Sequence, residues 1–475
     1  MKVLLINAPF DIPKMFGFKS RTKRLVYQQL GIGYIATGLE KAGHTVTFID
    51  CQALQLNIEE AIVRLHQEAP DLVGIPCFIA GRFIAFELIK SIRTACPNLP
   101  VVLGGPQLTS FPEQSFNECP ELELAILGEA DFSLAELASK IESSNSLDDI
   151  PGLIRRDISG KLVYGPPQEI VQDLDTIPFP SRHIYQRELY NPMPFMMSQP
   201  NMPTERVITS RGCPWAKCRF CYQSNTKASY YRRRSPENVI AELRLLTEEH
   251  AAEFVFFTDD NFFQDEIWVK HFCDLFDLAG YSFKWNAFGR VNTVTQTMLQ
   301  RASRSGCVHI SYGFESGNQE TLNLLRKGST LQQNRQAAQW ARDAGIEVAG
   351  FMMFGVPRET PEMAEQTIRF AIELNVDYMM FAPYHVFGGT PLAEIALQEG
   401  QLMEHDNVKF MLPTYVPNTY ESAEQLNKMV RKAYFRFYFR PRYVIRALWR
   451  ARKPGIFVNY VNKLWIGLQI ILFKP

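Results

Sequence analysis

The chain has 475 residues, 46% of them hydrophobic, and its 50 Lys and Arg residues balance its 50 Asp and Glu residues. This length allows two or three domains, and the apolar content excludes global disorder. A formal net charge of zero gives the whole chain no electrostatic attraction to nucleic acid, so we expect no nucleic-acid partner.

The nine cysteines are spread over a long chain, which does not suit a disulfide framework. The first residues, MKVLLINAPF, lack a cleavage site and are expected to form a strand. No uninterrupted apolar run approaches the roughly 20 residues that span a bilayer. A reducing cytoplasm is therefore the expected location.

The first 145 residues alternate short apolar strands with helical segments. Strands are predicted over 2–7, 45–49, 72–76, 101–103 and 124–127, and helices over 31–42 and 83–95. This alternation favours a doubly wound parallel sheet, in which ligands bind at the carboxyl ends of the strands. We expect a Rossmann-like binding domain over 1–145.

Residues 146–205 are rich in proline and are expected to form a linker with one hairpin, LIRRDISGKLVYG. From Arg206 the alternation resumes. Strands are predicted over 206–209, 253–257, 283–287, 308–312, 347–354 and 378–383. Six strand–helix units indicate a partial (β/α)6 TIM-like barrel over 206–420, with its chemistry at the carboxyl ends of the strands.

The tail, 421–475, is rich in Arg, Lys and aromatic residues and is predicted to be helical. Helices that pack beside the barrel, with arginines extending outward, are the preferred interpretation. An amphipathic segment on an anionic membrane is the alternative, because Leu464 to Phe473 is strongly apolar. The location would then be membrane-peripheral, which would suit a lipid-like substrate.

Three cysteines, Cys213, Cys218 and Cys221, lie within nine residues, directly after the first predicted barrel strand. Such a group can bind zinc or an iron–sulfur cluster. A structural zinc site usually has four ligands in two pairs, and no second pair is near in sequence. Three ligands on a four-iron cluster leave one iron open for substrate. We interpret the group as a 4Fe–4S site, with a structural zinc knuckle as the alternative.

The segment Ser210-Arg-Gly-Cys-Pro-Trp-Ala-Lys-Cys-Arg-Phe-Cys221 resembles the cluster motif of radical S-adenosylmethionine (SAM) enzymes, in which an aromatic residue precedes the last cysteine, as Phe220 does here. The common spacing places three residues between the first two cysteines. This chain has four, Pro214 to Lys217.

Nearly the whole chain resembles the subgroup that carries a cobalamin-binding domain before the radical SAM domain, namely class B radical SAM methyltransferases and the anaerobic magnesium-protoporphyrin ester cyclase. The resemblance rests on short motifs in a fixed order: Val101 to Pro106, Leu127 to Ala130, Asp173 to Pro180, Arg234 to Glu237, Phe257 to Asp260, Gly313 to Gly317, Lys327-Gly328 and Phe354 to Pro357.

This resemblance implies three cofactors: a 4Fe–4S cluster on the three cysteines, SAM and cobalamin. It implies SAM contacts at Phe220, Asp259, Asp260, Arg290, Glu315 and Val356. It implies cobalamin contacts at Pro9, Phe78, Gly104, Gly105, Gly128 and Glu129. A helix N-cap is the alternative role for the Asp259-Asp260 pair. No Asp-x-His-x-x-Gly motif is present to place a histidine under cobalt.

The implied activity is transfer of a methyl group from SAM through methylcobalamin to an unactivated carbon, after a 5′-deoxyadenosyl radical has removed hydrogen. A cyclase or ring-rearrangement enzyme without methyl transfer is one alternative, and a cobalamin-binding sensor with a structural metal site is another. The expected partners are a small-molecule or lipid-like substrate and an external electron donor of the flavodoxin or ferredoxin type.

Overall fold

The computed structural model describes residues 1–10, 26–190, 196–200, 202–225, 230–403, 412–452 and 457. The described chain forms two compact units. One contains residues 1–10, 26–172 and 176–190, and the other contains 173–175 and the described residues from 196 onward.

The first unit is built on a seven-stranded sheet with the order β2-β1-β3-β4-β5-β6-β7. Its parallel strands are β1 (Lys2–Asn7), β2 (Thr45–Asp50), β3 (Leu72–Pro76), β4 (Val101–Gly104) and β5 (Leu124–Ile126). All five predicted strands are present. The order reverses between β1 and β3, and ligands of doubly wound sheets bind at such a reversal, outside the carboxyl ends of the strands.

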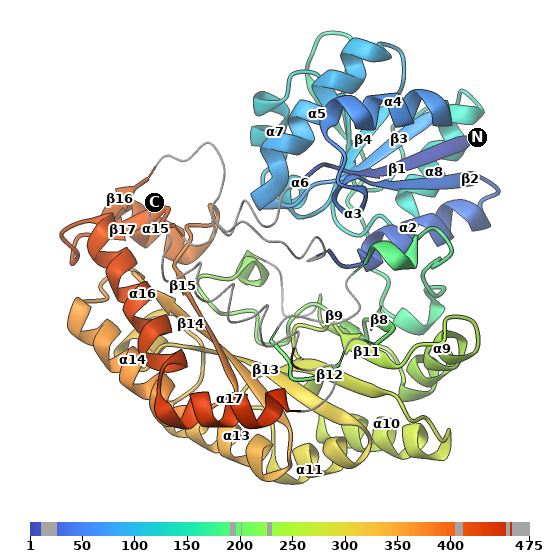
Figure 1. Ribbon diagram of the computed structural model, residues 1–475. Coiled ribbons are helices and arrows are strands. Elements are labelled where there is room, and N and C mark those ends of the chain that lie inside the picture. The colour runs from blue at the N-terminus through green and yellow to red at the C-terminus, as the bar shows by residue number, and fades with distance from the viewer. Residues whose placement is uncertain are drawn as a thin grey trace. The chain divides into compact units, whose positions relative to one another are not determined.

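Helices cover both faces of this sheet (Figure 1). The longer ones on one face are α4 (Ile58–Glu68), α5 (Arg82–Ala95) and α7 (Pro112–Glu118), and on the other α2 (Leu30–Lys41) and α8 (Ser133–Glu142). Within β1, Leu4 and Ile6 pack against the first group, and Val3 and Leu5 against the second. Burial on both sides explains why these strands are continuous apolar runs in the sequence.

The residues predicted to form a linker, 146–205, are divided between the two units. The predicted hairpin is present as β6 (Leu153–Arg156) and β7 (Leu162–Tyr164), which extend the first sheet antiparallel to β5. Further along, the Ser181 N–H donates to the carbonyl of Gly33 in α2 at 3.1 Å. This part of the predicted linker therefore packs on the first unit.

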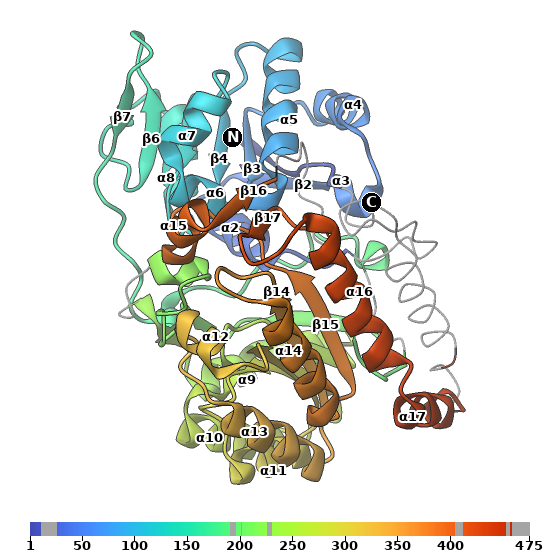
Figure 2. The same ribbon diagram turned by 90° about the vertical axis from the view of Figure 1, so that its left-hand side faces the viewer.

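The second unit contains six parallel strands in the order β15-β14-β13-β12-β11-β8. They are β8 (Thr204–Val207), β11 (Phe254–Phe257), β12 (Lys284–Gly289), β13 (Cys307–Glu315), β14 (Glu347–Phe354) and β15 (Tyr378–Pro383). In the described chain β8 and β15 do not pair, so the predicted partial barrel is confirmed as an open one (Figure 1). Figure 2 shows the edge strand β15 beside β14.

Helices alternate with these strands along the chain and pack around the sheet. They are α9 (Pro236–Glu248), α10 (Glu266–Leu278), α11 (Gln296–Arg304), α12 (Gln319–Leu324), α13 (Leu331–Asp343), α14 (Pro361–Leu374) and α15 (Pro391–Gln398). Ser or Thr side chains cap several of them: Ser235, Thr295, Thr330, Thr360 and Thr390 each accept from a backbone N–H of the first turn. The core between strands and helices is rich in aromatic rings around Trp285.

The described part of the tail is helical, as predicted, in α16 (Ala423–Tyr438) and α17 (Pro441–Ala451). α16 packs on the edge strand β15. The Tyr438 hydroxyl accepts from the Met379 N–H at 3.0 Å and donates to the Met379 carbonyl at 2.8 Å. The Tyr434 hydroxyl accepts from the Phe381 N–H at 3.2 Å. The preferred interpretation, packing beside the barrel, is confirmed for α16.

The apolar segment Leu464 to Phe473, on which the membrane alternative partly rested, lies outside the described residues. Among the helices that are described, none combines the length and the apolar character needed to cross a membrane.

One prediction concerns the contact between α2 and the loop before α8. A Cβ on Gly38 would lie 2.0 Å from the Asp131 carbonyl oxygen, whereas a Cβ on Gly31, in the same helix, would meet nothing within 4 Å. We expect Gly38→Ala to lower the free energy of unfolding by about 1–3 kcal/mol through overpacking. The control Gly31→Ala should be neutral or stabilise by about 0.5–1 kcal/mol. Urea unfolding followed by circular dichroism measures both, and equal effects would contradict the contact.

Candidate functional site

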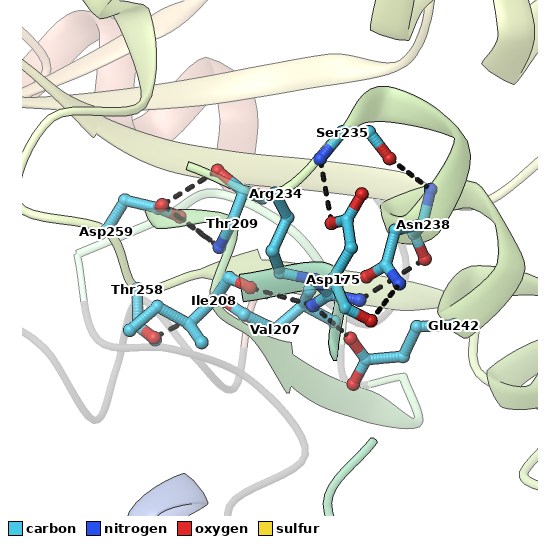
Figure 3. Close-up of polar contacts among 10 residues, drawn as sticks. All are labelled: Asp175, Val207, Ile208, Thr209, Arg234, Ser235, Asn238, Glu242, Thr258 and Asp259. Atoms are coloured by element: carbon cyan, nitrogen blue, oxygen red, sulfur yellow. Dashed lines mark hydrogen bonds and ion pairs between the residues drawn. The ribbon is translucent and has the colours of Figure 1, made fainter. Parts of the chain in front are cut away.

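The chain leaves β8 at Val207 and reaches Cys213 through Ile208, Thr209 and the short strand β9 (Ser210–Arg211). Buried polar side chains bind this connection (Figure 3). Asp259, which follows β11, accepts from the Thr209 N–H at 3.0 Å, the Thr209 hydroxyl at 2.7 Å and the Ser210 hydroxyl at 2.6 Å. Burial raises the pKa of Asp259, and the hydrogen bonds from Ser210 and Thr209 oppose that rise.

Arg234 binds the same connection from the other side (Figure 3). Its Nη1 donates to the Ile208 carbonyl at 2.8 Å and to Glu242 Oε2 at 2.5 Å, and its backbone N–H donates to the Thr209 carbonyl at 2.9 Å. Arg234 and Glu242 are both buried. A buried ion pair with further hydrogen bonds holds its geometry tightly.

Asp175 completes this support. Its Oδ1 accepts from the Ser235 N–H at 2.9 Å, and its carbonyl accepts from Asn238 Nδ2 at 3.4 Å, both at the start of α9. The motifs around Asp175, Arg234 and Asp259 are distant in sequence but meet at one place, where they position the cysteine loop. The sequence signalled these motifs without indicating that role.

The three cysteines lie on the loop after β9. Cys218 is buried, Cys213 and Cys221 are half-buried, and the Cys221 N–H donates to the Cys218 carbonyl at 3.1 Å. Burial is the main cause that raises the pKa of the Cys221 thiol to about 11, and Cys218, Asp260 and Cys213 act in the same direction.

Among the described residues, no three His, Cys, Asp or Glu side chains are grouped tightly enough to ligate one metal ion. In a 4Fe–4S cluster each cysteine ligates a different iron, so the sulfurs stand farther apart than around one ion. Three thiols on one short loop that do not converge on a single ion are consistent with ligands of such a cluster.

The extra residue between Cys213 and Cys218 is accommodated by specific backbone geometry. Ala216 adopts a left-handed conformation with φ of 41°. Trp215 donates from Nε1 to the Arg326 carbonyl at 2.9 Å, and the Arg219 N–H donates to the Leu325 carbonyl at 3.0 Å. The longer loop is therefore attached on both sides of Cys218 to the segment that follows α12.

Two cations lie beside Cys218. Arg290, after β12, donates from Nη1 to Cys218 Sγ at 3.8 Å and from Nη2 to the Lys327 carbonyl at 2.6 Å. Lys327 Nζ donates to Glu315 Oε1 at 2.7 Å. Burial raises the pKa of the Cys218 thiol, and Lys327 and Arg290 oppose that rise. The predicted residues Arg290 and Glu315 thus lie in one buried cluster with Cys218, linked by Lys327, which sequence reasoning did not assign to the site.

The other predicted SAM residues have different surroundings. The Phe220 ring centroid lies 5.8 Å from Lys327 Nζ, and the ring packs against the apolar cluster that contains Val356. Asp260 accepts from Gln223 Nε2 at 2.8 Å. The Asp259 carboxylate accepts hydrogen bonds from Thr209, just after β8, and does not cap a helix. The N-cap of α10 is Asp265. A SAM contact for Asp259 stays a prediction.

Glu359, five residues after β14, was not predicted. Its side chain is fully buried and accepts from the Gly355 N–H and from the Tyr420 hydroxyl, the latter at 3.3 Å. Burial raises the pKa of Glu359 to about 8. Among the described residues its Oε1 has no hydrogen-bond partner, which suits a protonated, neutral carboxyl group. Its signal in the sequence was Gly355-Val-Pro-Arg-Glu359 directly before a helix cap.

In the first unit, the loops after β3, β4 and β5 are joined at the carboxyl ends of the strands. The Cys77 N–H donates to the Gly104 carbonyl at 2.7 Å, and the Gly128 N–H donates to Thr109 Oγ1 at 3.0 Å. Gly105 has a φ of 102°, which residues with a side chain rarely adopt, and a Cβ there would lie 2.9 Å from the Cys77 carbonyl oxygen.

These loops carry the predicted cobalamin residues. Phe78 follows β3 and is 52% exposed, and the nearby loop after β5 exposes Phe132. Pro9 follows β1, and Glu129, whose carbonyl accepts from Gln168 Nε2, follows Gly128. Exposed aromatic surface beside glycine backbone fits a flat macrocycle.

The histidines of the first unit lie elsewhere. His44 precedes β2 and bonds to Ser139 at 3.0 Å, and His66 lies in the last turn of α4, just before β3. Both positions are at the amino ends of the strands. His183 pairs with Glu40, near the end of α2. The described carboxyl ends therefore present no histidine to a bound cofactor.

Comparison with known proteins gives two matching families: the radical SAM superfamily over residues 207–371 and the B12 binding domain over residues 22–138. An uncharacterized methyltransferase of Pyrococcus horikoshii is 30% identical over 94% of each chain. The anaerobic magnesium-protoporphyrin IX monomethyl ester cyclase of Cereibacter sphaeroides is 27% identical over 90% of this chain and 71% of its own.

Among solved structures, the radical SAM methyltransferase TsrM of Kitasatospora setae, with cobalamin and a 4Fe–4S cluster bound, has a similar fold. The TM-score is 0.69 at 19% identity, over 90% of this chain and 84% of that one.

The buried carboxyl of Glu359 predicts a pH dependence of stability. Between its ordinary pKa of 4.5 and the raised value of about 8, only the folded state holds the proton. The free energy of unfolding should therefore fall by up to about 1.4 kcal/mol per pH unit across this window and level off above it. Glu359→Gln has no titrating group at this position. The difference between its free energy of unfolding and that of the parent chain should therefore increase in favour of the variant from about pH 5 to about pH 8. Urea unfolding at several pH values tests this, and parallel curves would contradict it.

Proposed function

Because the chain belongs to the radical SAM enzymes that carry a cobalamin-binding domain, we propose that it transfers a methyl group to a carbon atom that is a poor nucleophile. The observation that carries this proposal is the presence, on one chain, of a three-cysteine loop at the carboxyl end of the first barrel strand and a parallel sheet edged by glycine and exposed aromatic residues.

The enzyme's cofactors are a 4Fe–4S cluster, SAM and cobalamin. When bound, these groups supply hydrogen abstraction from an unactivated carbon and delivery of a methyl group. The contribution of the chain itself is to bind and orient these groups, and to exclude water from them.

We assign the cluster to Cys213, Cys218 and Cys221, held in place through Asp259 and Arg234. Arg290 and Glu315 are proposed to bind the carboxylate and ribose of SAM. Within the described residues the second carboxylate oxygen of Glu315 accepts no hydrogen bond, which leaves it available to a hydroxyl group. Phe220, Asp259, Asp260 and Val356 are the remaining proposed SAM contacts.

In the first unit we propose that cobalamin lies at the carboxyl ends of the strands. The proposed contacts are Pro9, Phe78, Gly104, Gly105, Gly128 and Glu129. These loops contain no histidine, so they would supply no imidazole ligand to cobalt, and this would favour its reduced, nucleophilic state.

A cyclase is the second candidate, because the similarity to the anaerobic cyclase extends over 90% of this chain. The products distinguish the two functions. Methyl transfer should form S-adenosylhomocysteine together with 5′-deoxyadenosine, whereas cyclisation should form no S-adenosylhomocysteine.

We further propose a small-molecule substrate and an external electron donor of the flavodoxin or ferredoxin type. Reductive cleavage consumes an electron, and outside the cysteine loop the chain has only isolated cysteines. None of the nine cysteines forms a disulfide, which supports a reducing cytoplasm as the location.

Peripheral contact with an anionic membrane is proposed for α17. The helix turns arginines inward, where Arg450 pairs with Asp377 at 2.9 Å and with Glu347 at 3.3 Å. Its opposite face exposes Ile445, Leu448 and Trp449, each more than 60% exposed. No acidic residue follows Glu424 in the sequence, so this apolar face lies in a basic segment. Such a combination is typical of helices that lie on anionic membranes.

Anaerobic reconstitution tests the main proposal. We expect about four irons per chain with matching sulfide, one bound corrin and cleavage of SAM. Cys221→Ala should lose the iron but keep the corrin. Cys96→Ser, at an isolated cysteine of the first unit, should keep both. Zinc without sulfide in the parent chain would overturn the proposal.

Vesicle sedimentation tests the membrane contact. The parent chain should sediment with vesicles of phosphatidylcholine and phosphatidylglycerol but not with phosphatidylcholine alone. Replacing Ile445, Leu448 and Trp449 by serine should lower the bound fraction at least tenfold. The matched control is Leu397→Ser, because Leu397 of α15 is 61% exposed but lies outside α17. Equal sedimentation of both variants would argue against the proposed face.

A further inference from the structure

The loop between Cys213 and Cys218 contains a tryptophan whose ring has two fixed contacts in the described chain. Trp215 Nε1 donates to the Arg326 carbonyl at 2.9 Å. A Cβ added to Gly328 would lie 2.3 Å from Trp215 Cζ2, so the ring occupies the space that a side chain at this position would need. Because Gly328 also has a φ of +71°, this position favours glycine for two independent reasons.

The same ring contacts Arg290. The Arg290 guanidinium lies 5.3 Å from the Trp215 ring centroid, within the range of a cation–π interaction. That guanidinium also donates to Cys218 Sγ at 3.8 Å and to the Lys327 carbonyl at 2.6 Å. Asn292 Nδ2 donates to the Gly328 carbonyl at 2.8 Å. This bond joins the loop that carries Arg290 to the glycine that the Trp215 ring contacts.

These contacts form one chain of interactions, from the segment Arg326–Gly328 through Trp215 to Arg290 and on to Cys218. A hydrogen bond and a positive charge at a cysteine ligand stabilise the more negative, reduced state of an iron–sulfur cluster. The position of Arg290 therefore affects the reduction potential, and Trp215 is one of the groups that fix this position.

We propose that Trp215 is a positioning residue that holds Arg290 against Cys218 and thereby raises the reduction potential of the cluster. This inference rests on the proposed function, because it requires Cys218 to be a cluster ligand. It also gives the four-residue spacing a role, since the longer loop places an aromatic ring between the cysteines and against Gly328.

The test is a redox titration of the reconstituted holoenzyme, followed by the electron paramagnetic resonance signal of the reduced cluster. Trp215→Ala should shift the midpoint potential to a more negative value. Trp215→Phe keeps a ring but loses the indole N–H, so its shift should be smaller. Gly328→Ala should shift the potential in the same direction as Trp215→Ala, because the added methyl group displaces the ring.

Two controls are matched to these variants. Gly280→Ala replaces a glycine of nearly the same φ, +69°, where a Cβ would meet nothing within 4 Å. Lys217→Ala removes an exposed cation whose Nζ also lies 5.3 Å from the Trp215 ring centroid but which, within the described chain, donates no hydrogen bond to Cys218 Sγ as Arg290 does. Neither substitution should move the potential.

A double variant distinguishes positioning from a direct effect. If Trp215 acts through Arg290, the potential of Trp215→Ala with Arg290→Lys should equal that of Arg290→Lys alone. Additive shifts would overturn the inference, and so would an unchanged potential in fully loaded Trp215→Ala and Gly328→Ala. Loss of iron from Trp215→Ala, Trp215→Phe and Gly328→Ala alike, with normal loading of Gly280→Ala, would show a purely structural role and also overturn it. Full iron in Cys218→Ala would instead contradict the proposed function.

Discussion

The backbone between β8 and the first cysteine is satisfied by buried side chains, and the position of the cysteines depends on these bonds. The parallel pairing of β8 with β11 ends at Val207. Beyond it, the Ile208 carbonyl bonds to Arg234, and the Thr209 N–H bonds to Asp259. Buried backbone groups without partners are costly, so a change in either side chain disturbs the path of the cysteine loop. The end of β8 thus fixes the position of the loop that carries the three cysteines.

Much of the fold follows from local patterns in the sequence. The predicted strands 347–354 and 378–383 match β14 and β15 residue for residue, because each is a short apolar run with aromatic residues that ends at a glycine or proline. The first barrel strand was predicted over 206–209 but lies at Thr204–Val207. The difference has a physical reason: residues 208 and 209 bond to Arg234 and Asp259 rather than to β11, and no periodicity in the sequence reveals that.

The site was less predictable, because its contacts join residues that are distant in the sequence. The cysteine motif is local and could be read directly. Lys327 reaches Glu315 across α12, and Trp215 reaches the Arg326 carbonyl 111 residues away. Glu359 is unusual only because it is buried, and burial is a property of the fold. For Asp259 the sequence suggested a SAM contact or a helix cap, and only the fold shows that its carboxylate bonds to the strand end that leads to the cysteines.

The two tyrosines of α16 have a consequence for the substrates that the open barrel can bind. An edge strand normally offers its backbone groups to an extended peptide, which can add to the sheet as another strand. On β15, Tyr434 and Tyr438 already bind the N–H of Phe381 and both backbone groups of Met379. A peptide therefore cannot add to this stretch of β15 by main-chain pairing, and α16 closes this edge of the open sheet to a further strand.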